Sequence, residues 1–247
     1  MPGHDADADL AAKLAAQAGE AALVLRSSGR FDGDGLGREG DRLAHDLLLR
    51  GLSLHRPGDT VLSEEGPLLT ADAGRGRVWI VDPIDGTSEF AEGRCDWAVH
   101  VALAVDGEPV CGAVALPSRG LVLRSDRPRS LASPASRPRI AVSRNRPPPA
   151  GARLAAALDG DVLPMGSAGA KAMAVLLGEA EIYLHAGGQR LWDSCAPVAV
   201  ARASGLHCSR LDGSRLRYDP AEVDMPDLLI CHPQFAAAAL AAIRDGS

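Results

Sequence analysis

The stretch that most constrains the fold is an apolar run that ends in two aspartates. Residues 77–81 read RVWIV, and this β-branched run predicts a buried strand. Asp82 and Asp85 follow it. Pro83 and Gly86 interrupt the strand at this point. Two carboxylates held by a tight turn at the end of a strand are suited to a hard cation such as Mg²⁺.

The residues after this turn are suited to an anion. Gly86, Thr87 and Ser88 offer backbone N–H groups at a predicted helix start, where negative charge is stabilised. Metal ligands beside such a cradle indicate phosphate chemistry assisted by a metal.

Three motifs, taken in order, resemble a known family. D-P-I-D-G-T spans Asp82–Thr87, a pair of glutamates (Glu64, Glu65) precedes it, and Trp192-Asp193 with a small-residue helix follows. This order is similar to that of the magnesium-dependent, lithium-sensitive phosphatases of the inositol monophosphatase superfamily, over most of the chain. The resemblance implies a layered α+β and α/β sandwich (αβαβα) like that of the sugar phosphatases.

The order of predicted elements favours two lobes. Strands cluster early and then alternate with helices, so we expect an α+β lobe with the metal site over 1–135 and an α/β lobe with substrate-binding elements over 136–247. In the first lobe, the pattern predicts a loop over Gly29–Gly40, a helix over Asp41–Ser53, a short strand over Thr60–Ser63 and a loop over Leu68–Gly76.

Composition excludes several other classes of protein. The net charge of −6 over 247 residues disfavours nonspecific nucleic-acid binding. The five cysteines are scattered without a C-x-x-C, which favours a reduced cytosol over a disulfide framework or a zinc site. No apolar run has membrane-spanning length, so we expect a cytoplasmic protein that binds no membrane. Because many members of the resembled family are homodimers, a homodimer is a further expectation.

The resemblance implies a ligand set for Mg²⁺. Glu64, Asp82, the main-chain carbonyl of Ile84, Asp85 and Asp193 would hold two ions. The structural alternatives are turn roles for Asp82 and Asp85 and a helix cap for Asp193.

A third ion would involve Asp41, which the family also includes in its catalytic set. The sequence here reads GREGD over Gly37–Asp41 rather than the family's T-x-A-D. Binding of two ions or of three therefore stays open.

The same resemblance implies the catalytic roles. Glu64 and Thr87 would position the attacking water, and the N–H groups of Gly86 and Thr87 would bind the phosphoryl oxygens. We expect Glu64 rather than Glu65 to face the site, because consecutive residues of a strand point to opposite faces. The alternative role for Thr87 is a helix cap.

Two runs in the second half bear on the substrate. Gly166–Lys171 reads GSAGAK and resembles the G-S-x-x-K run of bisphosphate nucleotidases, which implies that Gly166, Ser167 and Lys171 bind substrate. Lys171 falls in the first turn of a predicted helix, where a cation is unfavourable without an anion nearby. The ordinary alternative is a surface lysine that reaches into solvent.

The second run is Ser143–Arg146, which reads SRNR and resembles the S-R-S-H run of the same subgroup. Ser143 and Arg144 would contact substrate, and an arginine fork suits a second phosphate. Exposed arginines are also commonplace in this Arg-rich chain. Asp193 is implied as a further substrate contact.

These features together predict a Mg²⁺-dependent phosphatase most similar to the bacterial 3′(2′),5′-bisphosphate nucleotidases. The implied substrate is 3′-phosphoadenosine 5′-phosphate, or its sulfate-bearing relative 3′-phosphoadenylyl sulfate, in sulfate assimilation. The alternatives are an inositol-1-phosphate or fructose-1,6-bisphosphate phosphatase and, outside enzymes, a metal-binding regulator.

Overall fold

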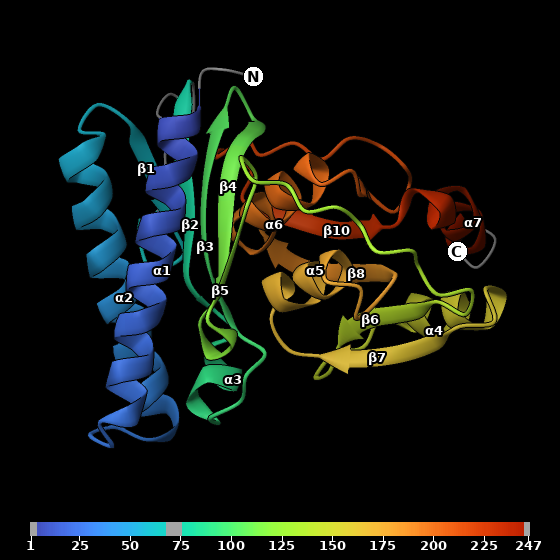
Figure 1. Ribbon diagram of the computed structural model, residues 1–247, viewed down its shortest axis with the longest axis horizontal. Coiled ribbons are helices and arrows are strands. Elements are labelled where there is room, and N and C mark those ends of the chain that lie inside the picture. Colours follow the sequence, from blue (N-terminus) through green and yellow to red (C-terminus); the bar gives the residue numbers. More distant parts are fainter. Residues whose placement is uncertain (1–3, 68–75, 245–247) are drawn as a thin grey trace.

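The computed structural model describes residues 4–67 and 76–244, which form two five-stranded sheets and three helical layers (Figure 1). The first sheet has β1 parallel to β2, and all its other neighbours are antiparallel. Its strands lie in chain order: β1 (Thr60–Ser63), β2 (Arg77–Asp85), β3 (Ala98–Val105), β4 (Glu108–Leu116) and β5 (Leu121–Arg124).

The second sheet is mixed. Its strand β6 is parallel to both β7 and β8, whereas β10 is antiparallel to β8 and β9. The spatial order is β7 (Asp161–Met165), β6 (Arg139–Ser143), β8 (Ile182–Arg190), β10 (Asp224–Cys231) and β9 (His207–Ser209).

Helices fill the remaining layers. Helices α1 (Asp5–Ser27) and α2 (Gly33–His55) cover the outer face of the first sheet, and α5 (Ala168–Leu176) and α6 (Leu191–Ala203) lie between the sheets. Helices α4 (Pro149–Ala157) and α7 (Pro233–Arg244) cover the far face of the second sheet. One apolar cluster lies beneath α1 and α2, a second joins both sheets through α5 and α6, and a third lies beneath α4 and α7. The predicted αβαβα order is therefore confirmed.

The start of α2 differs from the sequence prediction. Residues 29–40 were expected to form a loop, but a single helix runs over Gly33–His55. A Cβ on Gly40 would lie 2.5 Å from Phe90, and one on Gly37 would lie 2.9 Å from Thr87. These glycines allow α2 to approach the short helix α3 (Thr87–Ala91), which follows β2. They mark close packing, and the helix carries Asp41 to the end of β2.

Strand β2 also continues further than expected. Pro83 was expected to break it, but β2 runs to Asp85 with an irregular register, in which Asp82 pairs with His100 and Asp85 with Ala98. In a regular strand, residues three apart point to opposite faces. The irregularity, like a β-bulge, lets both aspartates face the same side of the sheet.

The remaining differences are smaller. The short strand β9 was not predicted. The predicted loop at Leu68–Gly76 lies outside the described residues except for Gly76. The division into lobes 1–135 and 136–247 stays a prediction, because one apolar cluster joins the facing sides of both sheets through α5 and α6. Within the described residues, no helix combines the length and apolarity needed to cross a membrane.

Candidate functional site

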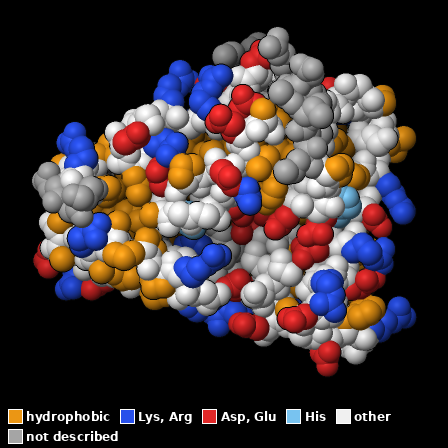
Figure 2. Space-filling view, turned by 180° about the vertical axis from the view of Figure 1, so that it is seen from behind, with side chains coloured by type: hydrophobic (Ala, Val, Ile, Leu, Met, Phe, Trp, Pro, Cys, Tyr) orange, Lys and Arg blue, Asp and Glu red, His pale blue; other side chains and the backbone are white. Residues whose placement is uncertain are grey.

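Three aspartates from two distant segments meet where β2 ends and α6 begins. Among the described residues, Asp82, Asp85 and Asp193 each offer one oxygen such that all three oxygens lie within 4.8 Å of one another. Asp82 and Asp85 come from β2, and Asp193 lies in the first turn of α6. On the face shown in Figure 2, acidic side chains gather near the middle of the molecule beside a hollow.

The Asp82 carboxyl group is buried without a donor. It is 1% exposed, and no hydrogen-bond partner reaches either of its oxygens. Burial, followed by the charges of Glu64 and Asp85, raises the pKa of Asp82 well above its usual range. A buried carboxylate without a partner is unfavourable unless a cation balances it. Its two free oxygens therefore fit a metal ion.

Glu64 follows β1 directly and lies beside the three aspartates. It is an exposed residue, but its carboxyl group lies near enough to the aspartates to feel their charge. This environment, together with the charge of Asp193, raises the pKa of Glu64 to about 7, and the nearby Asp82 carboxyl group offsets part of the rise. The negative charges of the aspartates therefore act on Glu64.

Asp41 approaches the cluster from α2. Burial and the charges of Glu65 and Glu64 raise its pKa to about 7, and its Oδ1 has no hydrogen-bond partner. The strand β1 ends at Ser63, so Glu64 and Glu65 lie in a turn. Alternation along a strand therefore does not set the directions of these two side chains, and the Glu65 charge also acts on Asp41.

The surroundings of Asp85 contrast with those of Asp82. Its carboxylate accepts hydrogen bonds from the Ser167 hydroxyl, from the Ala168 N–H at 3.0 Å and from the Gly169 N–H at 2.6 Å. The Nε2 atom of His100 lies 3.3 Å from Asp85 Oδ2. Burial opposes ionisation, but His100 and Ser167 hold the pKa of Asp85 well below its usual range.

Asp193 is held by its own helix and by β3. Its Oδ2 accepts the N–H of Arg190 at 2.6 Å, so it closes the start of α6 as the capping alternative predicted. Burial and the charge of Asp85 raise its pKa to about 6. The Nδ1 atom of His100 lies 3.0 Å from the Trp192 carbonyl oxygen. His100 therefore links Asp85 to the helix start that carries Asp193.

The turn after β2 places Thr87 beside two acceptors. The Thr87 hydroxyl donates to the Ile84 carbonyl at 3.1 Å and also faces Asp41. Gly86 has a φ of +90°, a left-handed conformation that favours glycine. The N–H groups of Gly86 and Thr87 precede the first helical hydrogen bond of α3, so the helix supplies them with no carbonyl partner.

Several hydrogen bonds hold the turn between β7 and α5 in place. Ser167 caps α5, because its Oγ accepts the Ala170 N–H at 2.9 Å. Lys171 is 4% exposed and donates from Nζ to the carbonyls of Gly166 (3.2 Å) and Ser167 (2.5 Å). It also lies 5.3 Å from the centre of the Tyr183 ring. The surface-lysine alternative is therefore wrong.

Arg144 is already paired with two carboxylates. Its guanidinium donates to Glu89 Oε1 at 3.2 Å and to Asp96. The neighbouring Ser143 accepts the Arg146 N–H at 3.2 Å, which forms a local turn. The structure thus brings the end of β6 close to α3, but it commits the Arg144 side chain to protein partners.

Three residues around the site were not predicted from sequence. Glu89 and Asp96 reach across to the second sheet, and His100 lies beside Asp85. A histidine within the apolar strand Ala98–Val105 was the one available signal for His100, because a buried imidazole needs polar partners.

Comparison with known proteins identifies relatives of this chain. A sequence profile of the inositol monophosphatase family matches residues 6–246. The chain is 51% identical over 239 residues to the 3′-phosphoadenosine 5′-phosphate phosphatase of Mycobacterium tuberculosis, covering 92% of this chain and 90% of that protein. It is 32% identical over 195 residues to the 3′(2′),5′-bisphosphate nucleotidase CysQ of Escherichia coli, covering 74% and 79%.

A solved structure shows the same fold. The crystal structure of CysQ from Bacteroides thetaiotaomicron, a bacterial member of the inositol monophosphatase family, superposes with a TM-score of 0.81 at 24% identity. The match covers 92% of this chain and 97% of that one.

Proposed function

This chain belongs to the inositol monophosphatase family, and we propose that it is a Mg²⁺-dependent phosphatase that hydrolyses 3′-phosphoadenosine 5′-phosphate to AMP and phosphate. The choice of substrate is supported by a relative named for this activity. About half of the aligned residues are identical, and the alignment covers most of both chains. The cluster of Asp82, Asp85 and Asp193 supports the need for a metal.

The residues that would hold Mg²⁺ are Asp82, Asp85, Asp193 and Glu64, with Asp41 beside them. The two free oxygens of Asp82 and the free Oδ1 of Asp41 carry this assignment, because buried carboxylate oxygens without donors suit a hard cation. Two or three ions are proposed. A bound divalent cation would supply positive charge that offsets the phosphate and makes water a better nucleophile.

The chain itself would orient the water and the phosphoryl group. Glu64, whose pKa is near 7 without metal, is placed to take a proton from the attacking water, and Thr87 is placed to orient it. The N–H groups of Gly86 and Thr87 would bind phosphoryl oxygens. No covalent intermediate is proposed.

The turn at Ser167 is our candidate for contact with the remainder of the nucleotide. Of the N–H groups from Gly166 to Ala170, those of 166, 168, 169 and 170 donate to Asp96, Asp85 or Ser167. The N–H of Ser167 alone has no such partner within the described chain, which leaves it available to an anion. Lys171 adds positive charge beneath this turn.

A phosphate-release assay tests the proposal. With Mg²⁺, we expect turnover of 3′-phosphoadenosine 5′-phosphate to exceed that of inositol-1-phosphate and fructose-1,6-bisphosphate by at least about tenfold in kcat/KM. Chelation of Mg²⁺ should abolish it, and Li⁺ should inhibit it. The variant Glu64→Gln, which keeps size and loses the base, is the control for contaminating phosphatase. Equal turnover of all three substrates would contradict the substrate assignment, and metal-independent release would contradict the mechanism.

A further inference from the structure

We propose that Arg144, Asp96 and Glu89 form a latch that holds the Gly166–Ser167 turn against α3. In this account Arg144 is a positioning residue, and it is not the ligand of a second phosphate. The kinetic test of this inference rests on the proposed function, whereas the test by amide hydrogen exchange does not.

Contacts from Arg144, Arg94 and the Gly166 backbone meet at Asp96. Arg144 at the end of β6 donates to Glu89 Oε1 at 3.2 Å and to Asp96 Oδ2. The same Asp96 oxygen accepts the Gly166 N–H at 2.7 Å, and Asp96 Oδ1 accepts Arg94 Nε at 3.0 Å. Asp96 therefore connects a cation of the second sheet to the backbone of the substrate turn.

Charge and burial explain why Arg144 is committed. Glu89 is 6% exposed, and the Arg144 side chain is 28% exposed. Burial opposes ionisation of Asp96, but hydrogen bonds from Arg144 and Gly166 hold its pKa below the usual range. For Arg144 to bind a phosphate, Glu89 would lose the cation that balances its buried charge, which is strongly unfavourable.

Close packing makes the latch specific to this turn. A Cβ on Gly166 would lie 2.3 Å from Glu89 Cγ, and a Cβ on Gly86 would lie 3.3 Å from Glu89 Oε2. Glu89 thus fills the space between the turn at the end of β2 and the turn before α5. The latch thereby sets the distance between the phosphoryl end of the site and Ser167.

The turn needs such support because its backbone is unfavourable. Ser167 has a φ of +48°, a region that residues other than glycine rarely adopt. Such a conformation persists only where the surroundings fix it. The Asp96 bond to Gly166 and the Lys171 bonds to both carbonyls of the turn do so. Without the latch, the Ser167 N–H would lose its fixed direction.

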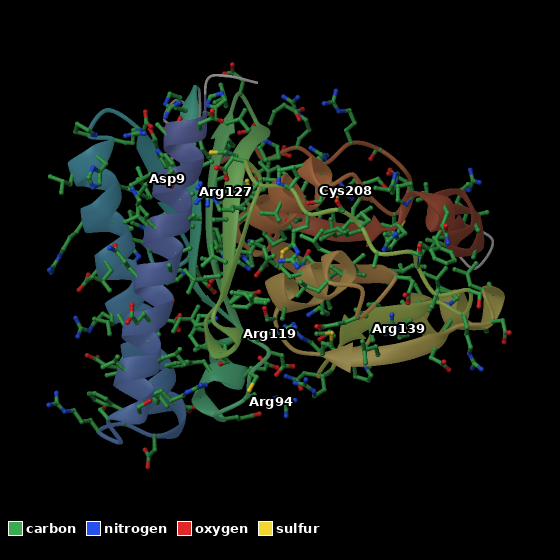
Figure 3. The ribbon with its side chains drawn as sticks, viewed as in Figure 1. Asp9, Arg94, Arg119, Arg127, Arg139 and Cys208 are labelled. Carbon is green, nitrogen blue, oxygen red and sulfur yellow. The ribbon has the colours of Figure 1, made fainter. Side chains whose placement is uncertain are left out.

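The chain offers a matched control in the same sheet. Arg139 at the start of β6 donates to both oxygens of Glu181, which is 1% exposed. This pair has the chemistry of the latch, but Glu181 accepts from Arg139 and Ala135 rather than from the substrate turn. Figure 3 shows Arg139 on β6 and Arg94 just beyond α3, at well-separated places.

The kinetic test compares Asp96→Ala, Arg144→Ala and the double variant of the full chain with Mg²⁺. The substrates are 3′-phosphoadenosine 5′-phosphate and 3′-AMP, which lacks the second phosphate. We expect each single variant to raise KM about tenfold for both substrates with a smaller change in kcat, and the double variant to be no worse. Arg139→Ala should lower Tm and leave KM unchanged. A KM increase in Arg144→Ala that is confined to the bisphosphate, with Asp96→Ala unaffected, would overturn the proposal.

Amide hydrogen exchange tests the latch without any substrate. We expect residues 165–170 to exchange about tenfold faster in Asp96→Ala and Arg144→Ala than in the wild type, and Arg139→Ala to leave them unchanged. Unchanged exchange in both latch variants would refute the latch even if the enzyme is active. If the wild type releases no phosphate while exchange responds as expected, the proposed function fails and the latch stands.

Discussion

Asp82 and Asp85 lie three positions apart on one strand, yet their environments are opposite. Asp82 is buried with no donor, and its pKa is raised, whereas Asp85 accepts three hydrogen bonds, lies beside His100, and has a lowered pKa. The first belongs to a group of carboxylates that repel one another, and the second belongs to a polar scaffold around α5. The difference suggests that the scaffold is complete in the protein alone, while the carboxylate group requires cations.

The largest effect is expected for Asp82→Asn. Loss of this charge should lower kcat by about 10³-fold or more, since electrostatic groups in such sites contribute on that scale. The same change should stabilise the metal-free protein at pH 8 by about 1 kcal/mol, because a buried charge among like charges is removed. Phosphate release and thermal unfolding without metal measure the two effects. A loss of both activity and stability would show that Asp82 is not electrostatically strained.

Asp85→Asn should have the opposite effect on stability. The amide would offer one acceptor oxygen to Ser167, Ala168 and Gly169, where the carboxylate offers two charged ones. We expect a loss of about 2–4 kcal/mol in the free energy of unfolding. Urea unfolding of the metal-free protein, next to Asp82→Asn, checks the sign. Equal changes in the free energy of unfolding of the two variants would contradict the contrast between the two aspartates.

Sequence reasoning was strongest where the information is local. The apolar run and the D-P-I-D-G-T turn located Asp82 and Asp85, and the family resemblance of the three motifs implied the layers and the meeting of these two residues with Asp193. What could not be predicted depends on contacts between distant segments. In the local sequence, Gly37 and Gly40 are typical of a loop. Only the packing of α3 against α2 shows why glycine is needed there.

The same limit applies to side-chain partners. Arg144 matches a substrate-binding run, but its pairing with Glu89 and Asp96 depends on how the second sheet meets α3. His100 lies beside Asp85 and the Trp192 carbonyl because β3 pairs with β2 and packs against α6, which no local pattern reveals. Local motifs identify which residues carry the chemistry, while long-range packing decides which of them have free atoms.

Gly40→Ala should test how α2 carries Asp41 into the carboxylate group. The added Cβ would lie 2.5 Å from Phe90 and 2.9 Å from Ile84, so we expect a loss of about 1–3 kcal/mol in stability. Gly35→Ala is the matched control, because it lies in the same helix with no atom within 4 Å of its Cβ position. That change should stabilise by about 0.5–1 kcal/mol. Equal behaviour of the two variants in thermal unfolding would contradict the packing account.

The pH dependence of stability should distinguish the carboxylates with raised pKa values from Asp85. The pKa values of Asp41 (about 7), Glu64 (about 7) and Asp193 (about 6) are raised in the folded protein, so it binds protons more tightly than the unfolded chain does. Their contribution is full below pH 4 and is lost as pH rises through 6 to 7. Metal-free stability should therefore fall by at least about 1 kcal/mol between pH 5 and 8.

Mg²⁺ should reverse this trend, because cations and protons compete for the same oxygens. The increase in Tm on adding Mg²⁺ should be larger at pH 8 than at pH 5.5. Asp85, with its lowered pKa, should not contribute in this range. A Tm increase that is independent of pH would place the cation away from these carboxylates.

The most direct test of the central claim is anomalous diffraction from crystals of the full chain soaked in Mn²⁺, a cation that takes the oxygen ligands of Mg²⁺. The account predicts at least one strong peak about 2.0–2.3 Å from oxygens of Asp82 and Asp85, with Asp193 or Glu64 completing the set, and no such peak in Asp82→Asn. A peak elsewhere on the protein, or none at this group of carboxylates, would contradict it.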